Sequence, residues 1–301
     1  MPQGLLGIEP LARGEIEQIL ERAKFFQPLQ KSFKRLDTLH GKLVVTLFFE
    51  NSTRTRTSFE IASKRLGADA VSISAAGTSL SKGESLVDTL NTLAAMRPDA
   101  IVMRHSASGA PHFLARYLET PIVNAGDGTH EHPTQALLDA LTILDHRDGL
   151  DGLRVAIIGD IVHSRVARSN VYLLSKFGAD IVLCGPPPLV PVHLADLAPG
   201  VTIEHDITKA IRDADVLMML RVQLERTHEI AYPANEYFRF YGLRLEHIDL
   251  AKPNAIVMHP GPINRGREIA SEVADSQKSV ILNQVENGVA VRMAVLEKIL
   301  Q

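Results

Sequence analysis

The chain has 301 residues, 45% of them apolar and 22% charged, and a formal net charge of -3. These values are typical of a globular protein, and the length suggests two domains of about 150 residues each. A pI of about 6.5 excludes a broadly basic surface, so we expect no nucleic-acid partner.

The cysteine content and the length of the apolar runs indicate the cellular compartment. Cys184 is the single cysteine, which excludes an internal disulfide and suits a reducing environment. We see no basic segment followed by an apolar stretch at the N-terminus, so a signal peptide is not expected. Apolar runs also stay below the roughly 18 residues that cross a bilayer. We therefore expect a cytoplasmic protein with no membrane partner.

The first half of the chain alternates short β-rich runs with helical stretches. Its first strand lies in GKLVVTLFFE and ends near Phe49. Further strands are expected at 69–74, 99–105 and 121–126, and helices at 53–66, 85–96, 110–118 and 133–147.

The same alternation restarts after the turn DGLDG at 148–152. Strands are expected at 153–160, 180–185, 201–206, 215–221 and 255–260, and helices at 165–177 and 207–214. The amphipathic run VRMAVLEKIL predicts a terminal helix.

Near-continuous apolar strands that alternate with helices indicate parallel sheets covered on both faces. We therefore predict an α/β protein with two doubly wound parallel-sheet domains, 1–147 and 148–288. The C-terminal helix, about 289–301, is expected to pack back on the first domain. Polar motifs follow several strands, and ligands of open α/β sheets bind beyond the carboxyl ends of strands. We thus expect an active site in a cleft between the domains.

The motif FFENSTRTRTSFE, at 48–60, has the composition of an anion site. A buried strand ends there and a helix begins at Ser52 to Thr55, where free N–H groups and the helix dipole favour a phosphate. Arg54 adds a planar fork that matches phosphate oxygens. Glu50 could orient an arginine from elsewhere. A capped helix with solvated arginines is the alternative, but it does not explain two arginines and four hydroxyls within the six residues 52–57.

STRTR followed by TSFE, together with HPTQALLD at 132–139, resembles the transcarbamoylase family. VMRH, TSLSKGESLVDT, LRVQLER and MHPGPINRGREI occur in the family's order, so the resemblance covers nearly the whole chain. It implies transfer of the carbamoyl group of carbamoyl phosphate to the amino group of L-aspartate. The products would be N-carbamoyl-L-aspartate and phosphate, a step of de novo pyrimidine biosynthesis, and no cofactor would be needed.

The resemblance also implies site residues. The expected catalytic residues are Arg54, Thr55, Arg104 and His132. The expected carbamoyl-phosphate contacts are these four with Ser52, Thr53, Gln135, Pro260 and Gly261, and with Ser79 and Lys82 from a neighbouring subunit. The expected aspartate contacts are Lys82, Arg165, Arg221 and Gln223. Ser81 is an alternative to Ser79, because the loop is one residue shorter than in some family members.

A shared site requires an oligomer, and the resemblance implies a homotrimer. It leaves open a larger assembly with regulatory or dihydroorotase-type subunits. It also implies a cis bond before Pro262.

Other functions fit less well. His130 and His132 suggest a metal, but they are followed at once by a proline and have no HExxH or CxxC partner, so we expect no metal. The strand end IIGDIVHS lacks the GxGxxG of a dinucleotide site. Ornithine is the nearest alternative acceptor, but two arginines suit a dicarboxylate better. A non-catalytic scaffold should have lost some of Arg54, Lys82, Arg104 and His132, and all four are present.

Overall fold

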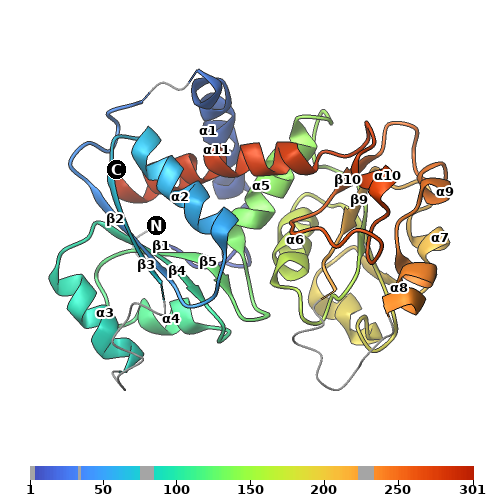
Figure 1. Ribbon diagram of the computed structural model, residues 1–301, viewed down its shortest axis with the longest axis horizontal. Helices are drawn as coiled ribbons and strands as arrows, with labels where there is room; N and C mark the ends of the chain where they lie inside the picture. The colour runs from blue at the N-terminus through green and yellow to red at the C-terminus, as the bar shows by residue number, and fades with distance from the viewer. Residues whose placement is uncertain (1–3, 33–34, 75–84, 223–233) are drawn as a thin grey trace. The chain divides into compact units, whose positions relative to one another are not determined.

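The computed structural model describes residues 4–32, 35–74, 85–222 and 234–301 (Figure 1). The chain forms two compact units, the first comprising Met1–Leu141 with Val285–Gln301 and the second comprising Thr142–Gln284. In the described residues each unit has a five-stranded sheet whose neighbouring strands all run parallel. The predicted fold class, two parallel-sheet α/β domains, is confirmed.

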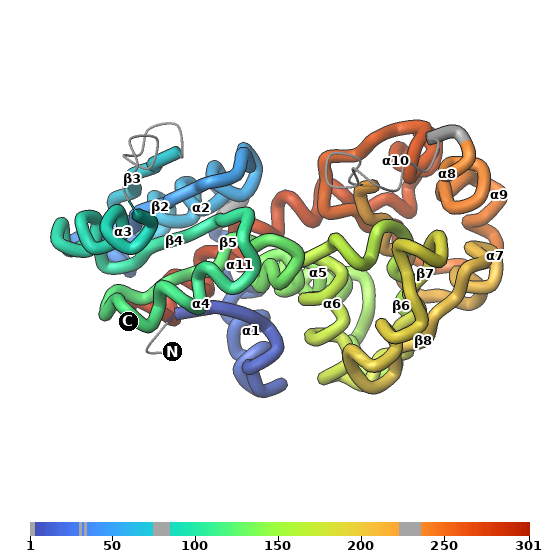
Figure 2. Tube along the Cα trace, turned by 90° about the horizontal axis from the view of Figure 1, so that it is seen from below, coloured from blue at the N-terminus to red at the C-terminus, as the bar shows by residue number. Residues whose placement is uncertain are grey.

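The sheet of unit 1 has the strand order β1-β5-β4-β2-β3. Its strands are β1 Gly4–Leu5, β2 Leu43–Phe48, β3 Asp69–Ser74, β4 Ala100–His105 and β5 Ile122–Asp127. Figure 2 traces β4, β2 and β3 side by side, with β3 outermost. The inner strands β2, β4 and β5 are almost wholly buried, as expected for a sheet covered on both faces. Their carboxyl ends therefore lie next to one another.

The helices that connect these strands begin where polar residues follow each strand. They are α1 Arg13–Lys31, α2 Thr53–Arg65, α3 Leu86–Ala95, α4 Ala110–Leu114 and α5 Pro133–Leu144. Helix α1 was not expected, and α4 ends four residues earlier than the expected 118. The expected bounds of α2 and α3 agree with the structure to within one residue.

The terminal helix α11, Ile281–Leu300, is longer than expected and begins ten residues before VRMAVLEKIL. Its later part lies beside α1 in unit 1 (Figure 1). Arg22 donates from Nη2 to Glu297 at 2.7 Å, and Gln27 donates to Asn287 at 2.8 Å. These side chains join the two ends of the described chain into one core.

The sheet of unit 2 has the strand order β10-β9-β6-β7-β8. Its strands are β6 Arg154–Ile158, β7 Asp180–Cys184, β8 Val201–Glu204, β9 Val216–Met219 and β10 Ile256–Met258. Its helices are α6 Arg165–Ser175, η3 Val192–Leu197, α7 Ile207–Ala210, α8 Ala234–Tyr241, α9 Leu245–Ile248 and α10 Ser271–Ala274. The helix expected at 207–214 is a single turn that ends at Ala210, and Asp213 beyond it has a positive φ of 56°.

Across the described ranges, no helix is both long enough and apolar enough to span a lipid bilayer.

Candidate active site

The first part of the site is the start of α2, directly after β2. Ser52 is the N-cap residue, but its hydroxyl makes no capping hydrogen bond. Thr53 and Arg54 are exposed in the first turn, whereas the side chain of Thr55 is buried. The positive end of the helix dipole thus has hydroxyls and a guanidinium around it, the arrangement that binds an anion.

A charged pair crosses the ends of β2 and β4. The Nε atom of Arg104 lies 3.2 Å from Oε2 of Glu50, and Nη1 of Arg104 donates to the carbonyl oxygen of Ala125 at 3.2 Å. Both charged side chains are mostly buried, so the guanidinium is held in place from two directions. His105, the next residue, stacks edge-on against Phe49, and burial lowers its pKa despite the nearby Glu50 and Asp127.

The loop from β5 to α5 is organised by Asp127, whose carboxylate is fully buried. Oδ1 accepts from the side-chain amide of Asn124 at 2.8 Å and from the N–H of Glu131 at 3.1 Å. Oδ2 accepts from the N–H of Gly109 at 2.6 Å and is bonded to Nδ1 of His130 at 3.0 Å. Burial alone would raise the pKa of Asp127, but these bonds bring it below its ordinary value. They also fix the loop that leads to His132.

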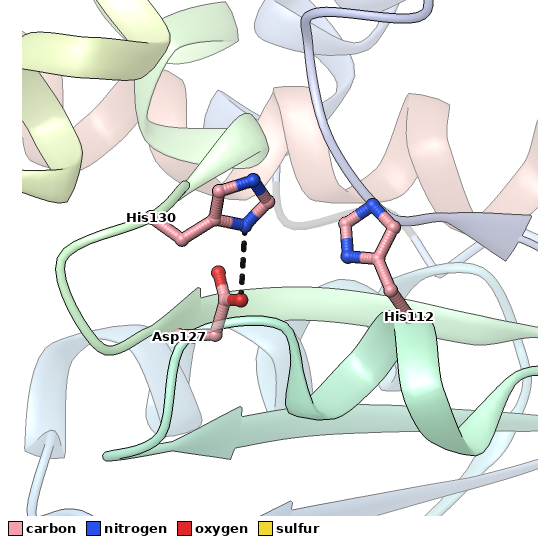
Figure 3. A group of neighbouring side chains, drawn as sticks. All are labelled: His112, Asp127 and His130. Carbon is pink, nitrogen blue, oxygen red and sulfur yellow. Dashed lines mark hydrogen bonds and ion pairs between the residues drawn. The ribbon is translucent and has the colours of Figure 1, made fainter.

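In the described ranges, the atoms of His112, Asp127 and His130 that could hold a metal lie within 4.8 Å of one another (Figure 3). A metal ligand needs a free lone pair, however, and both oxygens of Asp127 already accept two hydrogen bonds each. We therefore interpret this group as support for the loop.

His132 and Gln135 stand at the start of α5. His132 precedes the helix, Gln135 lies in its first turn, and both side chains are buried. The N–H of Gln135 donates to the carbonyl oxygen of His132 at 2.9 Å. One turn further on, Oδ1 of Asp139 accepts from Nε2 of Gln135 at 2.9 Å. Residues three and four apart share a helix face, so the three form one row.

Unit 1 therefore gathers one set of expected residues. Ser52 to Thr55 follow β2, Arg104 ends β4, and His132 with Gln135 follows β5. Because β4 lies between β5 and β2, these groups share the carboxyl edge of three adjacent strands.

In unit 2 the start of α6 follows β6. Ser164 caps this helix by accepting from the N–H of Ala167 at 3.1 Å. Arg165, the first helical residue, is buried with 6% of its surface exposed. Just before it, Asp160 is fully buried and bonds Nδ1 of His163 at 2.9 Å. A guanidinium this deep is not the solvated arginine of an ordinary helix surface.

Arg221 and the loop HPGP follow the next two strands, β9 and β10. Arg221 is half-buried, and Pro260 and Gly261 are partly exposed. Gly261 has a φ of +70°, a conformation that favours glycine, and the Gly261–Pro262 bond is cis as expected. Strands β10, β9 and β6 are neighbours, so these residues share one edge with Arg165.

A buried pair that the sequence did not single out supports the HPGP loop. Nε2 of His259 lies 3.2 Å from Oε1 of Glu268, and neither side chain is exposed. The same carboxylate accepts from the N–H of Asn264 at 2.6 Å, and Nδ1 of His259 accepts from the N–H of Gly261 at 2.8 Å. Both ends of the loop are therefore held by charged or polar groups away from water.

Three expected site residues, Ser79, Lys82 and Gln223, lie outside the described residues, as does the alternative Ser81. Asp139 was not among the expected site residues, although it belongs to the motif HPTQALLD. Its spacing of four from Gln135 on an expected helix was the signal that could have found it.

Comparison with known proteins agrees with this arrangement. A family profile described as aspartate/ornithine carbamoyltransferase, carbamoyl-P binding domain, matches residues 3–145. A second, described as aspartate/ornithine carbamoyltransferase, Asp/Orn binding domain, matches residues 151–299. The aspartate carbamoyltransferase catalytic subunit of Solibacter usitatus is 79% identical over 301 residues, with 100% of both chains covered.

Two solved structures have the same fold. Aspartate transcarbamoylase from Trypanosoma cruzi, in complex with carbamoyl aspartate and phosphate, has a TM-score of 0.91 and 32% identity and covers 100% of this chain and 96% of its own. Ornithine carbamoyltransferase from Pyrococcus furiosus has a TM-score of 0.89 and 32% identity and covers 98% and 96%. With both domain profiles matched and a relative of 79% identity along its whole length, the chain belongs to the aspartate/ornithine carbamoyltransferase family.

Proposed function

We propose that this chain is a transferase that moves the carbamoyl group of carbamoyl phosphate to the amino group of L-aspartate. The products are N-carbamoyl-L-aspartate and phosphate, which makes the reaction a step of de novo pyrimidine biosynthesis. Family membership gives the reaction class. The observation that carries the proposal is that the start of α2, Arg104, His132 and Gln135 all follow or end the adjacent strands β2, β4 and β5.

Carbamoyl phosphate binds to unit 1 in this proposal. The helix start from Ser52 to Thr55 holds the phosphate, and Arg104 lies between the phosphate and the carbamoyl oxygen. His132 donates to that oxygen, and Gln135 holds the amino group. Pro260 and Gly261 of unit 2 accept from the carbamoyl nitrogen through their backbone carbonyls. Lys82 and Ser79 complete the phosphate site from a neighbouring subunit.

Aspartate binds to unit 2, with Lys82 of the neighbouring subunit. The support is the pair Arg165 and Arg221, each at the end of a neighbouring buried strand. Two guanidinium groups match the two carboxylates of aspartate, and each can make a bidentate contact. Gln223 adds a polar contact beside Arg221. The cationic side chain of ornithine would be repelled by the same groups.

The proposed chemistry uses hydrogen-bond donors and positive charges of the protein. The amine nitrogen of aspartate attacks the carbamoyl carbon, so that a C–N bond forms while negative charge develops on the carbonyl oxygen. Thr55, Arg104 and His132 stabilise this charge. The C–O bond to phosphate then breaks, and phosphate leaves with the electron pair and takes up the amine proton. Arg54 and Arg104 neutralise the leaving group, and no protein general base is required.

The proposed assembly is a homotrimer, with a larger complex of regulatory or dihydroorotase-type subunits left open. Strand β3 is the edge of the sheet in unit 1, and Val71 on it is 48% exposed. Met96, which ends α3, is 67% exposed. An open strand edge and exposed apolar side chains are features on which a second chain can pack. We also infer a cytoplasmic location, because the single cysteine, Cys184, can form no internal disulfide and a free thiol suits a reducing compartment.

The test is carbamoyl transfer to aspartate and to ornithine, measured side by side with purified protein. We expect aspartate to be carbamoylated at least about tenfold more efficiently, because mispairing a desolvated charge costs several kcal/mol. Arg165→Met should reduce kcat/KM for aspartate and leave the affinity for carbamoyl phosphate nearly unchanged. Equal or reversed efficiencies for the two acceptors would overturn the proposal.

A further inference from the structure

The amide of Gln135 is oriented by a carboxylate. Its Nε2 donates to Oδ1 of Asp139 at 2.9 Å, and only 8% of Gln135 and none of Asp139 is exposed. An ionised carboxylate only accepts hydrogen bonds, so the partner must be the NH2 end of the amide. Oxygen and nitrogen project from the same amide carbon in different directions. Oε1 is therefore turned away from Asp139, and it accepts no hydrogen bond from the described residues.

A buried arginine interacts electrostatically with the carboxylate of Asp139 inside unit 1. Arg292 of α11 is 3% exposed, and its guanidinium attracts the carboxylate of Asp139. Nη1 of Arg292 donates to the carbonyl oxygen of Gly288 at 2.9 Å and to Oγ of Ser58 at 3.0 Å. Burial lowers the pKa of Arg292 to about 10, against the attraction of Asp139. The guanidinium is thus a buried cation whose charge favours the ionised, acceptor-only form of Asp139.

We propose that Asp139 is a positioning residue that turns the oxygen of Gln135 toward the carbamoyl group and so selects a donor with an NH2 in place of a methyl group. The proposal rests on the function proposed above. An amide oxygen in that position accepts a hydrogen bond from the carbamoyl NH2. It gives nothing to acetyl phosphate, which has the same size and phosphate but a methyl group there. A buried acceptor left without a donor is a penalty, so the orientation discriminates between two donors of equal shape.

A carboxylate at position 139 fixes the orientation of Gln135 better than an amide would, because an amide can flip and exchange its oxygen with its nitrogen. If position 139 carried an amide, it could either accept from Gln135 or donate to it. In the second arrangement the NH2 of Gln135 would face the NH2 of the carbamoyl group, donor against donor. The single charged acceptor at Asp139 removes this alternative. Its partner Arg292 comes from the far end of the sequence, and the positive charge of its guanidinium attracts the carboxylate.

The experiment compares two ligands in wild-type protein and in Asp139→Asn. The KM of carbamoyl phosphate and the inhibition constant of acetyl phosphate against it are measured at saturating aspartate. We expect the KM to rise about tenfold, the equivalent of one ordinary hydrogen bond, and the inhibition constant to change less than about threefold. The preference for carbamoyl phosphate therefore falls by at least about threefold. A merely structural role would weaken both ligands in parallel, and that result would overturn the proposal.

A double-mutant cycle tests whether Asp139 acts through Gln135. In Gln135→Met the amide is gone, so adding Asp139→Asn should leave the preference between the two ligands unchanged. A further loss of preference in the Gln135→Met background would overturn the proposal. Asp99→Asn is the matched control: it removes a carboxylate that bonds Lys42 and the N–H of Leu43 at the opposite end of β4, and both constants should stay within about twofold.

A second variant tests the proposal if Asp139→Asn fails to fold. Asp139→Asn leaves the buried Arg292 charge without its counter-charge, which can prevent folding. Asp139→Asn combined with Arg292→Met removes both charges and still lacks the carboxylate, so it must show the same loss of preference. An unchanged preference in this double variant overturns the proposal. A wild-type protein that forms no carbamoyl aspartate would instead overturn the proposed function, so the two failures are distinct.

Discussion

The Nε atom of Arg104 lies 3.2 Å from Oε2 of Glu50, and the pair joins the ends of the neighbouring strands β4 and β2. The side chains are only 14% and 18% exposed, so solvent screens the pair less than it screens a surface ion pair. Glu50 also places a negative charge near an expected phosphate site. That charge repels an anionic ligand. Its presence there is explained if Glu50 is needed to hold the guanidinium of Arg104 in place.

Glu50→Gln should lower kcat/KM for carbamoyl phosphate by about tenfold or more, since Arg104 loses a partner that fixes its direction. The loss should exceed the gain from removing a repulsive charge. Steady-state kinetics measure it, with Glu17→Gln as the control because Glu17 forms an exposed pair with Arg13 on α1. Improved binding of carbamoyl phosphate in Glu50→Gln would show that repulsion is the larger effect.

Arg54→Ala should reduce turnover by roughly a hundredfold, the usual scale for one preorganised charge-stabilising donor. The fold should survive, because Arg54 is exposed in the first turn of α2. Arg56→Ala is a matched control on the same helix, since Arg56 pairs with Glu60 at 3.8 Å along the helix surface. We expect its turnover to stay within about threefold, as for loss of a surface ion pair. Near-normal turnover in a folded Arg54→Ala protein contradicts the assigned role.

Local sequence patterns predicted the parts of the fold that depend on neighbouring residues. Strand β3 has the expected bounds, 69–74, because its alternation is contained in the strand itself. The helix start after Ser52 and the cis bond before Pro262 were also expected, although Ser52 makes no side-chain cap hydrogen bond. The pairing of Glu50 with an arginine from elsewhere was expected, and the structure identifies that arginine as Arg104.

Contacts between segments that are distant in the sequence could not be predicted from local patterns. Nothing near Arg292 in the sequence indicates that its charge is balanced by Asp139, because the two meet only when α11 packs on unit 1. The early start of α11, at Ile281, was not expected for a local reason. Its first turns carry polar residues that blur the amphipathic pattern. The pair of His259 and Glu268 likewise depends on how a loop folds back after β10.

Acid should weaken the fold through His112. Burial lowers the pKa of this half-buried histidine, with further effects from His130, Asp127, Arg116 and Glu9. The unfolded chain, with an ordinary histidine pKa of about 6.5, then binds more protons than the folded chain just below that pH. The free energy of unfolding is therefore unaffected by this group above about pH 7 and falls as the pH drops through 6.5.

The measurement is urea denaturation at several pH values between 5.5 and 8, followed by circular dichroism because the chain has no tryptophan. In His112→Gln the fall in unfolding free energy below pH 6.5 should be shallower, by at most about 1.4 kcal/mol per pH unit for one proton. Some fall remains, since burial also lowers the pKa values of His105 and His247. Parallel curves for wild type and His112→Gln below pH 6.5 would remove His112 as a cause.

The proposal of a shared active site makes the most exposed prediction. Arg54 belongs to the connection after β2, and Lys82 to the one after β3, so the two can serve a common phosphate from different chains. Arg54→Ala and Lys82→Ala subunits should each be nearly inactive alone. Mixed after dissociation, they should regain activity, because a hybrid ring joins the intact Arg54 of one chain to the intact Lys82 of the next.

The geometry of a cyclic trimer sets the size of this recovery. In a random equal mixture about three quarters of the trimers are hybrids, and each hybrid contains one intact site in three. Activity should therefore approach about one quarter of the wild-type value, a level that neither parent can reach by averaging. Subunit exchange must be verified with a size or charge tag on one parent. If exchange is complete and the mixture shows only the mean of the two parents, Lys82 serves its own chain or has no part in the site. A recovery well above one quarter would require a ring with more intact contacts than a trimer of these two subunits allows.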